Sequence, residues 1–425
     1  MIRHWGWCAA LTATIGQAAF GAELTRIASS GEPNDPFDMV VNLEYVRTQQ
    51  RELITREAHI DGGVDDVGEL RFVGVDNRLN VDVRIGIWQD LEFRYQLPIV
   101  FSQNRRWAYA RGRGPGNSSI TDNCLNADGT LTDPACPTTG VGSEPIAPVP
   151  SRSYRGGLGN MTFGLAYAFF NQAKDDTKPT WIAGFDYEAP TAPAINPYEL
   201  TSSGNRGSVG DKVHKYRLYT SLSRRMGIAD PYFQVHYTLP VRAGGFYSNC
   251  DNPDPDVLGS PANCGAPGWS RKNTGIDPPH QAGVVFGTEL NAQEDAKRDR
   301  KLAFDVRVFA NYVSKGRYYN ELSDLLRRLL YTQDYLNVGA SLGVVAHASE
   351  FLHFNARFGL AHNTEHTLTD EAVGKDLDGN GTVDVLATPG ELNPTFDFRT
   401  DMVSRRLRAS EANIFTANVS ATLNF

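Results

Sequence analysis

The feature of this sequence that most restricts its fold is the alternation of apolar residues with polar or small ones. From Leu79 to Ile87 every odd position is apolar, and the same rule holds from Leu91 to Phe101. Successive side chains of a β-strand point to opposite faces, so a period of two predicts strands with one apolar and one polar face. Because only residues 88–90 separate the two segments, they predict a hairpin with a tight turn.

Similar segments recur along the chain and predict about twelve strands. Their approximate spans are 38–50, 68–87, 90–102, 157–171, 179–190, 213–226, 229–243, 280–292, 300–315, 333–346, 349–363 and 411–425. Short connections alternate with long ones, which we expect at 103–155, 191–212, 244–280, 316–332 and 364–411. This order predicts an all-β, antiparallel, up-and-down fold.

A soluble β-sandwich would show the same alternation, so other features must distinguish it from a transmembrane β-barrel. Tight periplasmic turns alternating with long extracellular loops are typical of outer-membrane barrels. The apolar faces are rich in Phe, Tyr and Trp, as the aromatic girdles of such barrels require. The last strand ends at Phe425, which is similar to the terminal signal of these barrels. We therefore predict a closed transmembrane barrel of about 12 strands, integral to the bacterial outer membrane, because closure leaves no strand edge unpaired in lipid.

Composition excludes several other classes of protein. No segment after residue 22 approaches the roughly 18 consecutive apolar residues of a membrane-spanning helix. The formal net charge is -8, so the chain has no basic surplus and we expect no nucleic-acid partner. The nine histidines form no Ser/His or Asp/His pattern that indicates catalysis, and we expect no enzyme.

The N-terminus is similar to a secretory signal. Arg3 precedes a run of small and apolar residues, and Ala19 and Gly21 occupy the positions that a signal peptidase reads. We expect a signal peptide at 1–21, a periplasmic segment at 22–37 and the barrel at 38–425. The expected partners are outer-membrane lipid and lipopolysaccharide, and the barrel-assembly machinery through Phe425.

Short motifs in the first half of the barrel resemble those of one transporter family. They are Tyr95-Gln96-Leu97-Pro98, Tyr187-Glu188-Ala189-Pro190, Tyr237-Thr238-Leu239-Pro240, the hairpin Arg84–Glu92 and the strand Gly157–Leu165. In these the chain resembles the barrel family named for the meta-pathway of phenol degradation, whose members are proposed outer-membrane transporters. The resemblance spans about residues 75–310, leaves out the long loops, and implies a barrel that passes small molecules without a catalytic residue.

The polar faces of the strands supply candidate lumen residues. Those expected to form an eyelet are Asp82, Arg84, Glu92, Arg94, His236, Arg242, Arg307 and Arg357. The hairpin register places Arg84 across from Arg94, where like charges repel unless carboxylates neutralise them. A salt-bridge ladder that fills the barrel is one interpretation, and an eyelet that attracts anionic or polar solutes is the other.

The segment 376–384 has the spacing of a calcium-binding loop. Oxygen ligands are expected from Asp376, Asp378, Asn380, the Thr382 carbonyl and Asp384, at the positions that Ca²⁺ loops use. Ala387 stands where a bidentate Glu is usual, and Glu391 follows four residues later. The sequence therefore predicts weak Ca²⁺ binding in an outer loop, with an ordinary polar turn as the alternative.

Two further features lie in the predicted loops. The cysteines outside the signal segment are Cys124, Cys136, Cys250 and Cys264. Sequence alone allows three disulfide pairings, and we expect the local ones, Cys124–Cys136 and Cys250–Cys264, because each pair lies within one Pro/Gly-rich loop. A zinc site is the alternative, but it would need CxxC spacing that is missing. Leucines at helical spacing within 320–335 predict a short amphipathic helix. It would pack on neighbouring loops or close the mouth, and in a lipid-facing position Arg327 and Arg328 would meet lipopolysaccharide phosphates.

These features leave two functions open. The first is an outer-membrane channel or transporter for small solutes or hydrophobic compounds, including aromatic ones. The alternative is a surface-interaction or structural barrel that displays disulfide-braced, calcium-binding loops to a protein or cell-surface partner.

Overall fold

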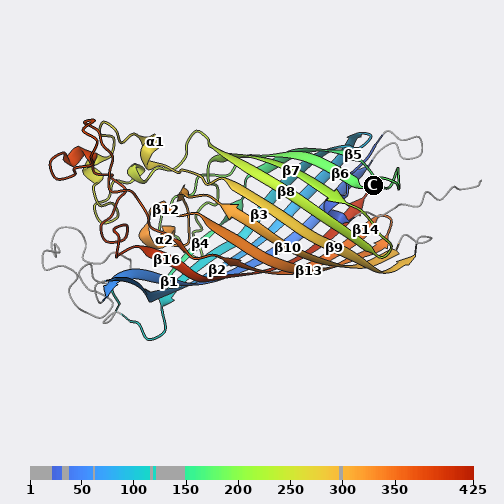
Figure 1. Ribbon diagram of the computed structural model, residues 1–425, viewed down its shortest axis with the longest axis horizontal. Helices are drawn as coiled ribbons and strands as arrows, with labels where there is room; N and C mark the ends of the chain where they lie inside the picture. The colour runs from blue at the N-terminus through green and yellow to red at the C-terminus, as the bar shows by residue number, and fades with distance from the viewer. Residues whose placement is uncertain (1–21, 31–37, 61–62, 115–117, 121–148, 296–299) are drawn as a thin grey trace, which may run out of the picture.

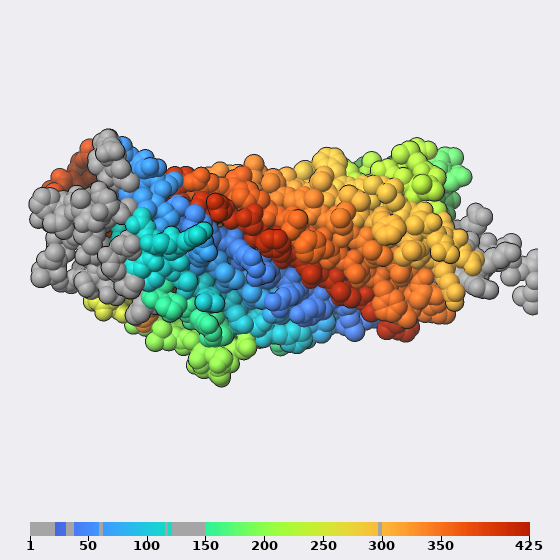
Figure 2. Space-filling view, turned by 90° about the horizontal axis from the view of Figure 1, so that it is seen from below, coloured from blue at the N-terminus to red at the C-terminus, as the bar shows by residue number. Residues whose placement is uncertain are grey.

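Twelve antiparallel strands form a closed barrel in the computed structural model, which describes residues 22–30, 38–60, 63–114, 118–120, 149–295 and 300–425. The barrel closes because β1 (Met39–Ile60) pairs with β16 (Leu407–Asn424) from Val40–Asn424 to Arg56–Leu407. Figure 2 shows β16 in red lying along β1 in blue. The predicted all-β barrel and its strand number are confirmed. The expected signal peptide, Cys124 and Cys136 lie outside the described residues.

The wall strands follow one another in chain order. They are β1, β2 (Gly63–Trp88), β3 (Leu91–Tyr109), β4 (Ser151–Leu158), β5 (Met161–Phe170), β6 (Thr180–Ala189), β7 (Val213–Ser223), β8 (Ala229–Arg242), β9 (Gln281–Asp295), β10 (Arg300–Val313), β13 (Tyr335–Ser349), β14 (Leu352–Asn363) and β16. Both β4 and β5 pair with β3, so they share one position in the wall. Figure 1 shows the long loops at one end, called here the loop end, and the C-terminus at the other, the turn end.

Short elements occupy the loops. The strands β11 (Gly316–Tyr318) and β12 (Leu330–Thr332) form a small separate sheet, and β15 (His366–Thr367) pairs with β16. The helices α1 (Arg271–Thr274) and α2 (Ser323–Leu326) are single turns. The predicted amphipathic helix is therefore much shorter than 320–335, because Arg327 adopts a left-handed conformation with φ 57° that ends it.

The wall is much taller on one side than on the other. The strands β1, β2, β3 and β16 are 22, 26, 19 and 18 residues long and form the tall wall, whereas β5 and β6 have 10 residues each. A membrane-spanning strand needs only about 9–11 residues. The predicted spans 38–50 and 68–87 were too short because residues 54–58 of β1 are buried on both faces, and polar residues such as Arg56 and Glu57 are among them, so the sequence there shows no apolar alternation.

The outer surface of the barrel is an apolar belt. Side chains exposed on it include Leu43, Phe163, Leu165, Phe185, Leu218, Leu239, Phe286, Phe304, Val308, Leu342, Phe358, Leu360 and Val419. Exposed aromatic side chains gather near the turn end, namely Trp88, Phe169, Phe170, Trp181, Phe351 and Phe425. Such a belt is stable only against hydrocarbon, and aromatic residues favour its interfaces. The chain is therefore an integral outer-membrane barrel. None of the described helices is long and apolar enough to cross a membrane.

The direction in which each strand residue points gives the first prediction. Leu342 on β13 is 64% exposed in the middle of the belt, and Asn337 on the same strand lines an internal cavity. Leu342→Arg is expected to lower the free energy of unfolding by about 2–4 kcal/mol, since it places a charge in lipid. Asn337→Arg should lower the free energy of unfolding clearly less, because its side chain points into the cavity. Urea titrations of both variants in lipid vesicles measure this, and equal losses would contradict the assignment of the two faces.

Candidate functional site

The interior of the barrel has three levels between the turn end and the loop end. Residues 22–30, called here the plug, lie inside the turn end. Above them is a layer of ion pairs and then two adjoining cavities. Residues 314–334, called here the cap, lie across the loop end.

The plug is fixed to the wall by hydrogen bonds on several sides. The backbone N–H of Glu23 donates to Glu289 Oε1 at 2.6 Å, and that of Ala28 donates to Glu92 Oε2 at 2.6 Å. Ser30 exchanges two backbone hydrogen bonds with Gln89, which lies in the turn between β2 and β3. Residues 22–30 therefore lie within the barrel, whereas the sequence placed them in a periplasmic segment.

Two histidines lie beside the plug. The rings of His347 and His353 stack at 3.6 Å between centroids, and His347 Nε2 lies 3.3 Å from Glu23 Oε1. Burial alone would raise the pKa of Glu23, but this hydrogen bond and the charge of Arg26 hold it well below its ordinary value. Ligand atoms of Glu23, His347 and His353 lie within 4.8 Å of one another, close enough to bind one metal ion. Arg26 Nη1 lies 2.8 Å from His353 Nδ1, so its positive charge opposes a cation there.

The layer above the plug is built from buried carboxylates. The residues Glu92, Asp230, Glu289 and Asp305 are all 0% exposed. Glu92 pairs with Arg94, Glu289 pairs with Lys301 at 3.2 Å, and Asp305 binds both Arg307 and Arg357. Most of these groups neutralise one another, as a salt-bridge ladder does. Nothing in the sequence singles out Asp230, since a single Asp at a strand start is ordinary.

The predicted lumen residues are distributed over several levels. The register pairs Arg84 with Arg94 and Asp82 with Gln96. Glu92, Arg94, Arg307 and Arg357 belong to the charged layer, and His236 lines the larger cavity. Arg242 is not part of this group, because it donates to the Lys272 carbonyl at 2.5 Å within a loop.

Two tyrosines narrow the interior at this level. The Tyr219 ring lies over Gly184, where an added Cβ would be 2.1 Å from Tyr219 Cζ. Tyr232 lies over Gly287 in the same manner, with its hydroxyl 2.3 Å from such a Cβ, and donates to Asp305 Oδ1 at 2.5 Å. Glycine is therefore needed at both wall positions for the rings to reach across the barrel.

Two adjoining cavities lie between the charged layer and the cap. The larger has a volume of about 700 Å³ and is lined mostly by polar side chains, among them Gln50, Gln96, Glu188, Lys215, Asn337 and Glu321. The smaller, of about 250 Å³, is lined by Val285, Phe309 and Ala361, with Arg307 and Arg357 beside them. Val285 and Phe309 line both cavities. We call them the polar chamber and the apolar chamber.

The cap packs onto the upper part of the tall wall. Leu322, Leu325 and Leu326 of the cap form a buried cluster with wall residues Ile54, Leu70, Phe72, Trp107, Leu407 and Ala409. Trp107 Nε1 donates to the Glu321 carbonyl at 3.1 Å, and Gln50 Nε2 donates to Glu321 Oε1 at 2.9 Å. Since Glu321 lines the polar chamber, the cap forms the roof of this chamber.

Buried ion pairs join the cap to β4 of the wall and to the surrounding loops. Arg155 Nη2 lies 2.5 Å from Asp324 Oδ1, and Arg317 pairs with Glu371. Arg328 is 1% exposed and lies 3.0 Å from Asp401 Oδ2. The hypothesis that Arg328 meets lipopolysaccharide is therefore wrong, because its charge is used inside the protein. Arg327 stacks over the Tyr198 ring at 4.0 Å.

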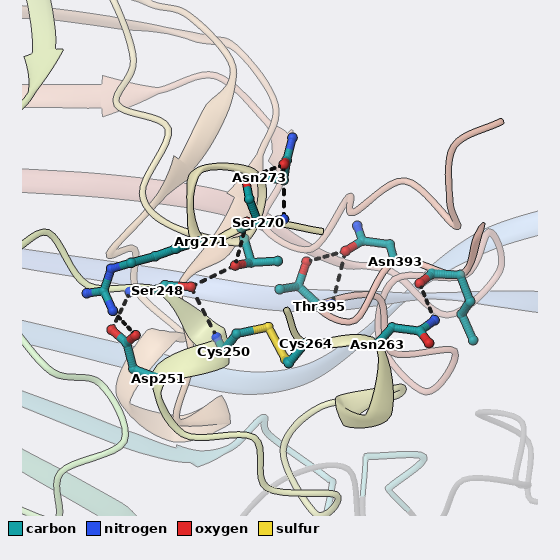
Figure 3. The surroundings of a disulfide bond; sticks show 12 residues. Ser248, Cys250, Asp251, Asn263, Cys264, Ser270, Arg271, Asn273, Asn393 and Thr395 are labelled. Atoms are coloured by element: carbon teal, nitrogen blue, oxygen red, sulfur yellow. Dashed lines mark hydrogen bonds and ion pairs between the residues drawn. A yellow bond between two sulfur atoms is a disulfide. The ribbon is translucent and has the colours of Figure 1, made fainter. Parts of the chain in front are cut away.

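The predicted disulfide Cys250–Cys264 is present and braces the loop 243–280. Figure 3 shows this bond with Asn263 reaching the segment that carries Asn393. Asn263 Nδ2 donates to the Leu392 carbonyl at 2.8 Å, and Asn249 exchanges two hydrogen bonds with Leu329 of the cap. The disulfide loop therefore connects the cap with the loop 364–406.

The predicted calcium loop brings only some of its residues together. Carboxylate oxygens of Asp376, Asp378 and Glu391 lie within 4.8 Å of one another. Asp384 Oδ1 instead accepts hydrogen bonds from the backbone N–H groups of residues 386 and 387, and Asn380 Oδ1 accepts from Thr382. Hydrogen bonds from Gly381 and Gly379 lower the pKa of Asp376.

Comparison with known proteins gives only distant matches. No protein-family model and no curated protein matches the chain. An outer-membrane channel from Pseudomonas putida F1 matches 93% of this chain and 100% of its own at 9% identity, with a TM-score of 0.45. A TodX monoaromatic hydrocarbon channel mutant matches 96% and 99% at 10% identity, with a TM-score of 0.32. A Pseudomonas aeruginosa FadL homologue matches 91% and 90% at 10% identity, with a TM-score of 0.32. At these identities and TM-scores, neither a solute nor the role of any residue can be carried over to this chain. The resemblance to the meta-pathway family is not confirmed.

The buried pair of Arg328 and Asp401 gives the second prediction. Arg328→Met leaves a buried carboxylate without its cation and should destabilise the cap and the loop 364–406 by about 3–5 kcal/mol. Adding Asp401→Asn should restore part of this loss. Hydrogen exchange of both segments measures it. Arg271→Met is the control, because Arg271 is 51% exposed in its pair with Asp251 and should cost at most about 1 kcal/mol.

Proposed function

We propose that the barrel is a channel for small molecules that combine an apolar ring or chain with a polar substituent. The observation that carries this proposal is the pair of adjoining chambers between the plug and the cap. Binding cavities for small molecules have volumes of about 300–1,000 Å³ and are lined by apolar residues with a few polar groups. The two chambers together have this size and this mixture of surfaces.

The apolar chamber indicates the class of solute more closely. A cavity of about 150 Å³ is sufficient for benzene, so about 250 Å³ accommodates a substituted single ring. Phe309 and Val285 offer apolar contacts to a ring, while Arg307 and Arg357 lie at the same chamber and favour a polar or anionic substituent.

The plug and the cap are the natural gates of such a channel. Each lies across one end of the barrel, and a solute that enters or leaves must displace it. Internal chambers of this volume have no role in the alternative, a barrel that only displays loops to a partner, and so they favour the channel.

Phe309 gives the prediction that tests this function. It lines both chambers, so Phe309→Trp should narrow their junction and slow transport several-fold. Phe304→Trp is the matched control, because Phe304 lies on the same strand and is 48% exposed on the outer surface. The measurement is uptake of radiolabelled benzenesulfonate into proteoliposomes.

Two results would contradict the proposal. Wild-type proteoliposomes that take up benzenesulfonate no faster than protein-free vesicles would exclude a channel for this solute class. Equal slowing by both tryptophan variants would show that the chambers are not on the path.

We also propose that Asp376, Asp378 and Glu391 bind Ca²⁺ in the loop 364–406. Glu391 is fully buried and its two oxygens accept from the N–H groups of residues 377 and 384, so it is held in place beside the two aspartates. It supplies the carboxylate that Ala387 lacks. Three carboxylates and few other ligands favour weak binding, with a dissociation constant of roughly 0.1–1 mM.

Limited proteolysis tests this calcium proposal. Millimolar Ca²⁺ should protect the loop 364–406 from cleavage in the wild type, because it neutralises repelling carboxylates. Asp378→Asn and Glu391→Gln should abolish the protection, and Asp384→Asn should retain it, since Asp384 accepts hydrogen bonds elsewhere. Cleavage that is the same with Ca²⁺ and with chelator would reduce the motif to a polar turn.

A further inference from the structure

One buried carboxylate in the charged layer lacks a cation. Asp230 lies at the start of β8 and is 0% exposed. Within the described part of the chain, neither of its oxygens accepts a hydrogen bond. A buried charge without a partner is costly, so this site is incomplete as it stands.

The neighbours of Asp230 make the missing charge more evident. The strand register places Asp230 opposite Glu289, and Glu289 opposite Asp305, in one row across β8, β9 and β10. Glu289 and Asp305 have cations of their own, as described above. Two cations lie near Asp230, but Lys301 forms its ion pair with Glu289 and Arg225 forms its ion pair with Glu294. The row therefore has one carboxylate more than its ion pairs account for.

The first residue of the plug lies at this carboxylate. Ala22 is 0% exposed, and its backbone nitrogen approaches the Asp230 carboxylate. The next nitrogen, that of Glu23, donates to Glu289 at 2.6 Å. Two successive nitrogens of the plug thus face two adjacent carboxylates of the row. As a peptide nitrogen, that of Ala22 has one N–H and no charge.

We propose that the α-ammonium of Ala22, formed when residues 1–21 are removed, is the cation partner of Asp230 and locks the plug in the turn end. The inference rests on the expected cleavage after Gly21. In that step a signal peptidase uses one water molecule to hydrolyse the amide bond between residues 21 and 22. Gly21 keeps a carboxylate, and Ala22 keeps an amine that takes up a proton.

The new ammonium has what the site lacks. It carries one positive charge and three N–H donors, and it lies beside a carboxylate that has neither an ion pair nor a hydrogen bond. With this pair formed, each of Glu92, Asp230, Glu289 and Asp305 has a cation. The plug of the uncleaved chain has the hydrogen bonds of Glu23, Ala28 and Ser30 but no such charge, so this ion pair forms only after processing during export.

Amine labelling of the folded protein tests this proposal without any transport measurement. The mature protein is purified from the outer membrane, and its mass must correspond to a chain that begins at Ala22. The folded barrel is treated briefly with N-hydroxysuccinimidyl acetate at pH 8 and digested with trypsin. Acetylation of the peptide 22–26 is then compared with that of protein unfolded in urea.

The expected result is at least tenfold slower labelling of Ala22 in the folded wild type than in the unfolded protein. Asp230→Asn, which keeps the shape of the side chain, should abolish most of this protection. Glu294→Gln is the matched control, a carboxylate at the same end that pairs with Arg225, and it should leave Ala22 protected.

Several outcomes would overturn the proposal. They are a mature chain that begins elsewhere, equal labelling of folded and unfolded wild type, and full protection in a folded Asp230→Asn variant. If that variant does not fold, the pH dependence of the labelling rate of Ala22 in the folded wild type tests the ion pair instead. An ion-paired ammonium must titrate above the ordinary value of about 8, and an unshifted midpoint contradicts the pair.

Discussion

The closure of the wall between β1 and β16 is the constraint on which the rest of the structure depends. Hydrocarbon offers no hydrogen-bond partner to a backbone group, so a sheet can cross a membrane only if it has no free edge. Here the first and last strands pair over almost their whole length. The start of β1 and the end of the chain also meet at the turn end, where Met39 and Phe425 exchange two backbone hydrogen bonds. Closure fixes the diameter of the interior, and everything inside must fill that fixed space.

The interior is filled with charge rather than with apolar side chains. The inward positions of the strands meet one another across a narrow space, and carboxylates such as Glu92 and Asp305 are buried there. Burial of a carboxylate is acceptable only with a cation and hydrogen bonds, which accounts for Arg94, Arg307 and Arg357 at the same level. The same rule applies in the cap, where Arg328 and Arg155 are held by Asp401 and Asp324. Both ends of the chambers are thus closed by elements that ion pairs hold in place.

The sequence was informative wherever one face of a strand meets lipid. From Leu91 to Phe101 the alternation predicted the strand and its two faces, because lipid tolerates only apolar residues on one of them. The alternation gave no prediction above the membrane, where β1 continues to Ile60 and β2 begins at Gly63 without such a pattern. The local disulfide Cys250–Cys264 was predictable from spacing. The plug could not be predicted, because its contacts with Glu92 and Glu289 join residues 64 and 266 positions apart. A segment of only nine residues contains no pattern that indicates such contacts. For the same reason Glu391, rather than Asp384, joins Asp376 and Asp378.

The unequal height of the wall determines how the mouth of the barrel can open. At about 3.3 Å per residue, β2 with 26 residues extends far beyond β5 with 10. All wall residues in the apolar cluster under the cap, from Ile54 and Phe72 to Leu407, belong to the tall wall. Apolar packing thus holds the cap on the tall wall, and a smaller cluster, in which Leu329 packs with Val213, Tyr247 and Ile276, holds it on β7 and the loop 243–280. Neither cluster includes a residue of β5 or β6, so an aperture would open on this low side of the rim and face obliquely along the membrane surface.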